Sequence, residues 1–294
     1  MEWVVLLLLV PAILIPVVLL FGFAGCGAFL EVGAATPVIA SATPLDPQTV
    51  EVRWTDPNTV PVSFEVERRK GSDAPGEPIA LTASPLLDGA LEAGTEYTYR
   101  VRAIRLSDGD LSPWSSEATI QTWSRAFSGG LAQNGSNASV TGDCIVQRLV
   151  PGTVGAHINL IGITVRAATD GDLVLSRVTI SRPALSGNDF ESDAPPKDVI
   201  TSPVTVTAGT VAALPPVEFV VPIAEALLIA FDVGNPGNGR FVGGVPHTMY
   251  IKEAPPGSLI AEAGAQNRAG FQTRPNELWF IDAIDVATKW PPVS

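Results

Sequence analysis

Short runs of valine, isoleucine and threonine, separated by glycine and proline, constrain the fold of this chain more than any other feature. The 294 residues include 26 prolines and 27 glycines, which fall between these runs. Both residues mark turns and are disfavoured inside helices. Beyond residue 30 there is no convincing amphipathic helix of 10 or more residues. Spaced short strands with this punctuation predict an all-β chain of sandwich or jelly-roll type.

The first 30 residues differ from everything that follows. No charged side chain occurs from Trp3 to Leu30, and Trp3–Phe23 is almost wholly Leu, Val, Ile, Ala and Phe. At about 1.5 Å rise per residue, roughly 20 such residues span a hydrocarbon core of about 30 Å. The sequence therefore predicts a helix over most of residues 3–23, exposed to lipid or to another apolar surface.

The apolar segment ends at Phe23-Ala-Gly-Cys26, which resembles the box that precedes the lipidated cysteine of bacterial lipoproteins. The resemblance implies lipid on Cys26. Met1-Glu2 departs from it, because a secretory signal normally starts with positive charge and the first basic residue here is Arg53. An uncleaved anchor and an ordinary cleaved signal are the alternatives. All three deliver the rest of the chain to a membrane or across it.

Charge, cysteine and histidine content narrow the classes of function. The formal net charge of -12 argues against nucleic acid or an anionic lipid surface as the main partner. Two cysteines are too few for a disulfide scaffold. With Cys26 lipidated, Cys144 is a single thiol and is expected to be a small buried hydrophobe; a bridge between them requires that no lipidation occurs. His157 and His247 are distant in sequence, so we expect neither a metal nor a cofactor.

Residues 37–123 alternate between apolar and polar side chains in several places. The apolar positions of three such runs are Val50, Val52 and Trp54; Phe64 and Val66; and Tyr97, Tyr99, Val101 and Ala103. Antiparallel strands with one buried face produce this period of two. Asp-Pro and Asp-Gly pairs between the runs are typical of turns. The pattern therefore predicts antiparallel strands around one core.

These residues resemble a fibronectin type III domain over nearly all of its length. The match is carried, in order, by Pro37, Trp54, Leu91-Glu-Ala-Gly-Thr-Glu-Tyr97, Tyr99-Arg-Val-Arg-Ala103, Ser112-Pro-Trp-Ser115 and Ala118-Thr-Ile-Gln-Thr122. The resemblance implies a seven-stranded sandwich with Trp54 in its core. It also implies a tyrosine corner at Tyr97, whose hydroxyl bonds to nearby backbone. No Arg-Gly-Asp triplet occurs, so integrin-type recognition is not implied, and we expect a spacer or adaptor.

The rest of the chain is expected to form a second domain. Residues 124–139, rich in Gly, Ser, Asn and Ala, are interpreted as an interdomain linker. The predicted division is a signal or anchor over 1–30, a tether over 31–36, the type III domain over 37–123, this linker, and a C-terminal domain over 140–294. Strand candidates in that domain are Ile158–Ala167, Leu173–Ile180, Val204–Val206, Val217–Val221, Ala226–Val233, Met249–Ile251 and Leu278–Val286.

Seven or eight strands in about 150 residues favour a jelly-roll-like β-sandwich. Their order resembles the accessory carbohydrate-binding jelly rolls of bacterial and phage surface proteins. Sugar sites use exposed aromatic rings that stack on pyranose rings, with carboxylates or amides that bond the hydroxyl groups. The candidate binding residues are Asp189, Asn235, Asn238, Phe241, Phe271 and Asn276. Trp279 and Tyr250 are further aromatic candidates for stacking, but they lie inside strand patterns and are expected in the core. Recognition is expected on the loops 185–198, 234–245 and 264–276.

No motif for catalysis stands out. A nucleophile elbow, a phosphate-binding loop and a metalloprotease helix motif are all missing from the sequence. Paired carboxylates for glycoside hydrolysis leave no sequence mark. The turn Asp232–Gly239 is rich in oxygen ligands but lacks the regular spacing of a calcium loop. We therefore expect no catalytic residue and no enzymatic activity.

These features predict a membrane-anchored, surface-displayed adhesion or binding protein with an extracytoplasmic location. Residues 3–23 or lipid on Cys26 would contact the membrane, and the C-terminal sandwich would bind a glycan or a protein partner. The alternative is a structural component of a phage virion or surface filament, in which the N-terminal helix serves assembly. An accessory part of a secreted hydrolase is the weakest of the three. The sequence leaves the oligomeric state open, including a homo-oligomer.

Overall fold

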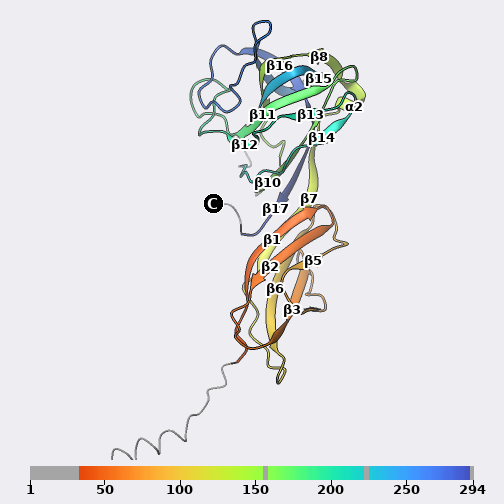
Figure 1. The fold of residues 1–294 in the computed structure, drawn as a ribbon, viewed down its shortest axis with the longest axis vertical. Helices are drawn as coiled ribbons and strands as arrows, with labels where there is room; N and C mark the ends of the chain where they lie inside the picture. The colour runs from red at the N-terminus through yellow and green to blue at the C-terminus, as the bar shows by residue number, and fades with distance from the viewer. Residues whose placement is uncertain (1–32, 155–157, 222–224, 292–294) are drawn as a thin grey trace, which may run out of the picture.

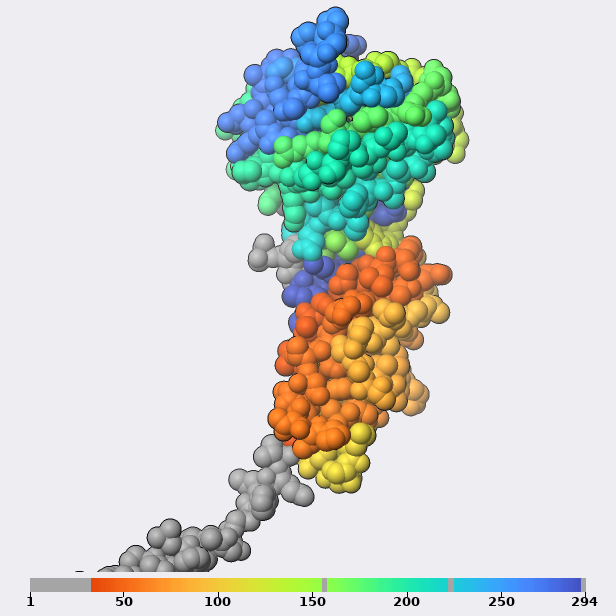
Figure 2. All heavy atoms as spheres, in the orientation of Figure 1, coloured from red at the N-terminus to blue at the C-terminus, as the bar shows by residue number. Residues whose placement is uncertain are grey.

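The computed structural model describes residues 33–154, 158–221 and 225–291, and nearly all of its regular structure is β-strand (Figure 1). This confirms the all-β prediction. Two lobes are joined by a narrow waist (Figure 2). The helix predicted over 3–23 and the lipidation site Cys26 lie outside the described residues. Within those residues, no helix is long and apolar enough to cross a membrane.

The first lobe is the fibronectin type III-like unit. Its strands are β1 (Val38–Asp46), β2 (Thr49–Thr55), β3 (Val62–Lys70), β4 (Ile79–Leu81), β5 (Leu86–Asp88), β6 (Glu96–Arg105) and β7 (Ala118–Ser128). One sheet has the order β1-β2-β5, and the facing sheet contains the antiparallel run β7-β6-β3-β4. This is the seven-stranded, two-sheet sandwich that the sequence resemblance implied.

The core of this unit contains the two aromatic residues expected there. Trp54 is buried and meets the Phe64 ring edge-on, with ring centroids 5.4 Å apart. Tyr97 is also buried, and its hydroxyl accepts a hydrogen bond from the backbone N–H of Glu92 at 3.0 Å. Since the partner lies a few residues upstream, this is the predicted tyrosine corner.

Strand β7 does not end with the first unit. Its last residues pair antiparallel with β17 (Ile281–Thr288), which also pairs with β10 (Leu160–Arg166). One seven-stranded sheet, β14-β10-β17-β7-β6-β3-β4, therefore passes through both units, and β7 and β17 form the waist in Figure 1. Beyond β17, the backbone N–H groups of Trp290 and Ala42 each donate to the other residue's carbonyl at 2.8 Å.

The prediction of a linker over 124–139 is wrong in its first part. Residues 124–128 belong to β7, and helix α2 (Leu131–Asn134) and strand β8 (Ser136–Ser139) follow. Ala126 and Phe127 pack against the core of the second unit. Because β17 supplies hydrogen-bond partners, a stretch with the composition of a linker is held as a strand. The two units are thus joined by a shared sheet.

The second unit is also a two-sheet β-sandwich. Its other strands are β9 (Cys144–Leu149), β11 (Leu173–Ser181), β12 (Lys197–Ile200), β13 (Val204–Val206), β14 (Val211–Ala213), β15 (Leu227–Lys252) and β16 (Gln272–Trp279). The sheet facing β14-β10-β17 has the order β12-β11-β15-β16, with β13 on β11 and with β8 and β9 on β15. The connection order of a jelly roll remains a prediction. The predicted strand Val217–Val221 forms only an isolated bridge to Ile161.

Strand β15 organises this unit. It is 26 residues long and returns on itself, so that β9 pairs on one side with Leu227–Asp232 and on the other with Thr248–Lys252. Alternate β9 residues face opposite ways. Ile145 and Leu149 enter the main core, whereas Cys144 and Val146 enter a smaller cluster on the outer face of the sheet. Cys144 is a free, buried thiol.

A break separates β16 from β17 and divides the predicted strand Leu278–Val286. Phe280 has a φ of 60° at this point and turns its ring into the core, edge-on to Phe231 with centroids 5.4 Å apart. Gly239 lies beneath this ring, and a Cβ at that position would overlap it. The glycine of β15 therefore makes room for the aromatic side chain that closes the core.

Candidate ligand-binding site

A cavity of approximately 430 Å³ opens at the edge of the second sandwich, where β8 ends and β16 pairs with β15. We call it the edge cavity. Its lining residues are Ala138, Ser139, Val140, Asp143, Phe241, Met249, Ile251, Glu253, Ala254, Arg274, Glu277 and Trp279. The volume falls within the roughly 300–1,000 Å³ that small-molecule sites occupy.

Two aromatic rings form one wall of the edge cavity. Phe241 of β15 and Trp279 of β16 are direct cross-strand partners. Their rings are stacked, with centroids 4.6 Å apart and planes inclined by only 11°. Trp279 is buried and Phe241 is half-buried, so the phenyl ring is the more accessible of the two. Cross-strand pairing of this kind fixes both rings on a rigid element.

A buried glutamine holds the two strands in register behind this wall. Gln147 of β9 has no exposed surface. Its amide nitrogen donates to the carbonyls of Thr248 and Glu277, each at 3.0 Å, and its amide oxygen accepts from the N–H of Trp279 at 2.9 Å. These bonds bridge the irregularity where β15 and β16 change register between Gly243 and Thr248. Gln147 is thus a positioning residue that the sequence analysis missed.

Polar groups of the edge cavity are mostly acidic. Glu277 accepts a hydrogen bond from the indole N–H of Trp279 at 2.8 Å, which fixes both side chains. Arg274 and Glu253 form an ion pair at 3.7 Å, in which both side chains are about half exposed. Asp143 is buried at 8% exposure, and one of its carboxylate oxygens accepts from the N–H of Ala254 at 2.8 Å.

Burial raises the pKa of the Asp143 carboxyl above its usual range, and the nearby charge of Glu253 adds to this rise. The hydrogen bond from the backbone of Ala254 acts in the opposite direction, because it favours the charged carboxylate. Desolvation is the larger effect. Asp143 is therefore a carboxylate held in a poorly solvated position at the cavity wall.

Of the six residues predicted for binding, Phe241 lies in the edge cavity. Asn276 is close in sequence, next to Glu277, but it is exposed with a φ of 61° at the irregularity between β15 and β16. Asn235 is exposed on β15. Asn238 donates its backbone N–H to the carbonyl of Asp172 at 3.0 Å and so ties β15 to the start of β11.

The expectation of a displayed loop over 234–245 is therefore wrong for most of its length. The stretch is part of β15, where it pairs with β8, β11 and β16. Its polar and glycine-rich composition is typical of a turn, yet these small residues allow close approach of neighbouring backbone. Of the three binding candidates in this stretch, Asn235 faces solvent and Asn238 serves the sheet, so only Phe241 lines the edge cavity.

Asp189 and Phe271 lie at a different place, next to Tyr250 and Phe190 respectively. Phe190 lies against Phe271 and Tyr250, with ring centroids 5.2 Å apart in both pairs. Burial raises the pKa of Tyr250, and the charge of the neighbouring Asp189 raises it further. Because Tyr250 alternates with Met249 and Ile251 along β15, this group lies on the opposite face of the sheet from the edge cavity.

A buried arginine holds together the cluster of Phe190, Tyr250 and Phe271, which we call the outer group. Arg268 is 2% exposed and donates to the carbonyls of Phe190 at 2.6 Å and Ala263 at 2.8 Å. It thereby pins two loops to the outer face of the sheet. Partners of this kind satisfy a buried guanidinium. The group is best explained as a small satellite core.

Histidine and metal chemistry find little support among the described residues. His247 is buried, its pKa is lowered by burial, and its ring meets Phe127 edge-on at 5.2 Å. His157 lies outside the described ranges. In residues 33–154, 158–221 and 225–291 no group of three or more His, Cys, Asp or Glu side chains is arranged to hold a metal ion.

A larger cavity of approximately 530 Å³ lies at the junction of the two units. Trp123 of β7 lines it and donates its indole N–H to the carbonyl of Pro44 at 3.1 Å. The indole ring also reaches Gly162 of β10, where a Cβ would stand 3.5 Å from it. Trp123 therefore contacts both units at their junction. Asp46, Ser124, Arg125 and Asp285 also line this cavity, and Arg125 and Asp285 form an ion pair with each other at 2.6 Å.

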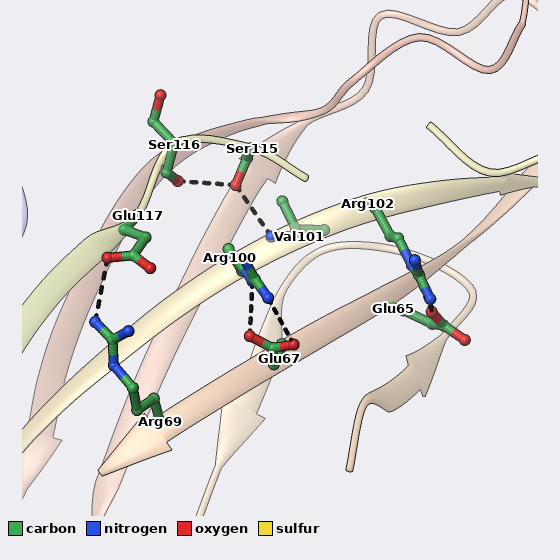
Figure 3. A network of polar contacts seen from close by, with 9 residues as sticks. All are labelled: Glu65, Glu67, Arg69, Arg100, Val101, Arg102, Ser115, Ser116 and Glu117. Atoms are coloured by element: carbon green, nitrogen blue, oxygen red, sulfur yellow. Dashed lines mark hydrogen bonds and ion pairs between the residues drawn. The ribbon is translucent and has the colours of Figure 1, made fainter. Parts of the chain in front are cut away.

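The Ser112-Pro-Trp-Ser115 motif, which helped to identify the first unit, is structural. The guanidinium groups of Arg100 and Arg102 lie 4.8 and 4.4 Å from the Trp114 ring centre. Figure 3 shows Arg100 paired with Glu67 and Arg102 with Glu65 beneath this motif. The Ser115 hydroxyl accepts from the N–H of Val101 at 3.0 Å. Each of these four charges is thus paired with an opposite charge, which gives this face a structural role.

Comparisons with known proteins do not identify this chain. The sequence matches no protein-family model and no curated protein. Among solved structures, a segment of two fibronectin type III domains from chicken tenascin is 17% identical, with a TM-score of 0.24, and the match covers 83% of this chain and 97% of that one. Chitinase ChiA74 from Bacillus thuringiensis is 15% identical, with a TM-score of 0.22.

The match to the chitinase covers 69% of this chain but only 27% of that enzyme. At these TM-scores neither overlay carries an argument about fold or function. The type III-like fold of the first unit rests on its strand order and its tyrosine corner.

Proposed function

We propose that this chain is a surface-displayed binding protein without enzymatic activity and that its edge cavity holds a glycan. The observation that carries the proposal is the stacked pair of Phe241 and Trp279 beside the carboxylates of Asp143 and Glu277. Of the sites described above, this one combines an accessible aromatic face with several hydrogen-bond acceptors.

Sugar chemistry fits such a wall. The apolar face of a pyranose ring packs on an aromatic ring, and its hydroxyl groups donate to carboxylates placed at the rim. Charge-assisted hydrogen bonds are about twice as strong as neutral ones. Phe241 would supply the stacking face, while Asp143 and Glu277 would accept from hydroxyls. Because these residues lie on paired strands, their positions are set before the ligand arrives.

The placement of the units suits display from a membrane. The described chain begins at the end of the first unit that points away from the second (Figure 1). There the backbone N–H of Ala34 donates to Asp110 at 3.1 Å and that of Ala35 donates to Asn58 at 2.7 Å. An anchor at residues 3–23, or lipid on Cys26, would thus hold the edge cavity at the distal end. The shared sheet would make the arm stiff.

A glycan array probed with the full chain in detergent tests the binding proposal. We expect specific glycans to retain the wild-type protein and the Phe241→Ala variant to lose at least about 90% of this signal, which corresponds to roughly 1.4 kcal/mol. Phe271→Ala is the matched control, since it removes another partly buried phenylalanine from the opposite face. Equal binding by wild type and Phe241→Ala would remove the edge cavity as the site.

Metabolic labelling with a fatty acid tests the proposed anchor. Label is expected on the wild type and on Cys144→Ala, whose thiol is buried and free, and it should be lost in Cys26→Ala. Membrane retention after alkaline washing without any label would replace lipidation by an uncleaved helix. A protein found wholly in the soluble fraction, at full length, would contradict both forms of the anchor.

A further inference from the structure

The charges of the edge cavity suggest which class of glycan it takes. Three carboxylates line it, those of Asp143, Glu253 and Glu277, against the one guanidinium of Arg274. Arg274 pairs with Glu253 at the rim. Among the described residues, no ion pair involves Asp143 or Glu277. Two carboxylates therefore remain without a protein cation at the wall of one cavity.

The surroundings of these two carboxylates strengthen their field. The floor of the cavity consists of apolar side chains that are almost fully buried, including Met249 at 1% and Ile251 at 4% exposure. Charges interact more strongly beside such a low-dielectric floor than in bulk water. Burial and the charge of Glu253 raise the pKa of Asp143. A positive group in the cavity would relieve both of these effects.

The aromatic wall acts in the same direction. The face of an aromatic ring carries partial negative charge and attracts a cation within about 6 Å of its centre. The Phe241 ring, backed by Trp279 at 4.6 Å, presents such a face. The carboxylates of the edge cavity select for ligand groups that donate hydrogen bonds, because ionised carboxylates accept hydrogen bonds but cannot donate them.

From this juxtaposition we propose that the edge cavity recognises a glycan that bears a free ammonium group, of the unacetylated amino-sugar type. The ammonium would lie between Asp143 and Glu277, with the ring carbons on Phe241. The inference rests on the proposed function, since it assumes that the cavity binds a glycan. Uronic acids, sialic acids and sulfated sugars would place like charges together, and N-acetylation would remove the cation that the carboxylates attract.

Titration calorimetry of the full chain with three oligosaccharide probes tests the inference. The probes are a glucosamine tetramer, an N-acetylglucosamine tetramer and a galacturonate tetramer. We expect the glucosamine probe to bind about 10- to 100-fold more tightly than the acetylated one, as hydrogen bonds to charged groups suggest. The galacturonate probe should not bind measurably.

Two charge-neutral variants each remove the negative charge of one carboxylate while keeping its hydrogen bond to the protein. Glu277→Gln can still accept from the indole N–H of Trp279, and Asp143→Asn can still accept from Ala254. Each should reduce the preference for glucosamine over N-acetylglucosamine by about tenfold or more. Glu51→Gln, which alters an exposed ion pair with Arg53 on the first unit, is the matched control and should leave the preference unchanged.

The outcomes separate the inference from the proposed function. Equal affinity for the amine and acetylated probes, or an unchanged preference in both charge variants, would overturn the inference; binding that is lost in Phe241→Ala would still support the glycan site. Tighter binding of galacturonate would overturn the inference as well. If the glycan array finds no ligand and none of the three probes binds, the proposed function itself fails.

Discussion

The two β-sandwich units differ in the length and the pairing of their strands. In the first, strands of 3 to 11 residues pair with one or two neighbours each, as β3 does with β6 from Val62 to Lys70. In the second, one strand of 26 residues, β15, pairs with β8, β9, β11 and β16 in turn. The first unit is therefore held by local alternation, while the second depends on how one long strand bends.

The bend of β15 also produces the candidate site. Its returning arm brings Met249 and Ile251 beside Phe241, and the irregularity between Gly243 and Thr248 leaves room at the edge of the sheet. Register changes of this kind are typical of functional edges of β-proteins. The first unit has no comparable bend, and its polar face is filled by matched ion pairs (Figure 3).

Removing a core aromatic from the first unit should have the largest effect. Trp54→Ala is expected to lower the free energy of unfolding by about 3–5 kcal/mol, because a buried ring is lost and a cavity remains. Thermal unfolding followed by circular dichroism measures this. Trp114→Ala is the contrasting control: it removes a half-buried ring that packs against Arg100 and Arg102 and should have a smaller effect, of about 1–2 kcal/mol. Similar losses in both variants would contradict the assigned core.

The sequence predicts the first unit, which is built of short strands, more completely than the second, which is built around the long strand β15. Trp54, Tyr97 and the alternation around them were sufficient for the first sandwich, because each of these motifs occupies one strand or turn and can be recognised from neighbouring residues. The prediction of separate strands over Ala226–Val233 and Met249–Ile251 was incomplete, since both belong to β15. Val217–Val221 has the composition of a strand but finds only one bridge, at Val217.

The site was predicted only in part for a related reason. Phe241 was a candidate because exposed aromatic rings stack on pyranose rings, but its partner Trp279 was expected in the core, where most of its surface does lie. Asp143, Glu253 and Glu277 come together only through the pairing of β15 with β9 and β16. No local sequence pattern predicts that these three carboxylates lie close together. Glutamine at position 147, in a run of apolar residues, was the one overlooked signal.

Replacing Gln147 should destabilise the second unit by an amount comparable to the effect of Trp54→Ala on the first. Gln147→Leu keeps the volume but leaves two carbonyls and the N–H of Trp279 without partners. An unsatisfied buried group costs about 1–3 kcal/mol. Chemical denaturation gives the change in stability, and glycan binding should weaken in parallel, because the β15–β16 register is lost. Unchanged binding by a destabilised Gln147→Leu would show that this register does not position the site.

The tyrosine corner offers the matching hydrogen bond in the first unit. Tyr97→Phe removes only the bond from the N–H of Glu92, so stability should fall by about 0.5–1.5 kcal/mol. Denaturant midpoints measured alongside those of Gln147→Leu compare the two units directly. Since Tyr97 is remote from the edge cavity, glycan affinity should stay at the wild-type value; a parallel loss of binding would mean that the units are coupled more strongly than we infer.

The pH dependence of stability should show the smallest effect, with opposite signs in the two units. The N–H of Ala34, followed by Arg105, lowers the pKa of Asp110, so its contribution is present above its ordinary pKa and is lost as pH falls. Burial raises the pKa of Asp143, so the folded state holds that proton longer and stability falls as pH rises from the ordinary value to the raised one. Melting temperatures of Asp110→Asn and Asp143→Asn, measured between about pH 3 and pH 7, should therefore lose slopes of opposite sign.

Hydrogen exchange of the full chain, with and without a bound oligosaccharide from the array, tests the central claim most directly. The account predicts new protection in residues 274–279 of β16 and 249–254 at the end of β15, with little change in the first unit. Protection confined to the junction around Trp123, or to the outer group around Phe190 and Phe271, would contradict the assignment of the edge cavity as the ligand-binding site.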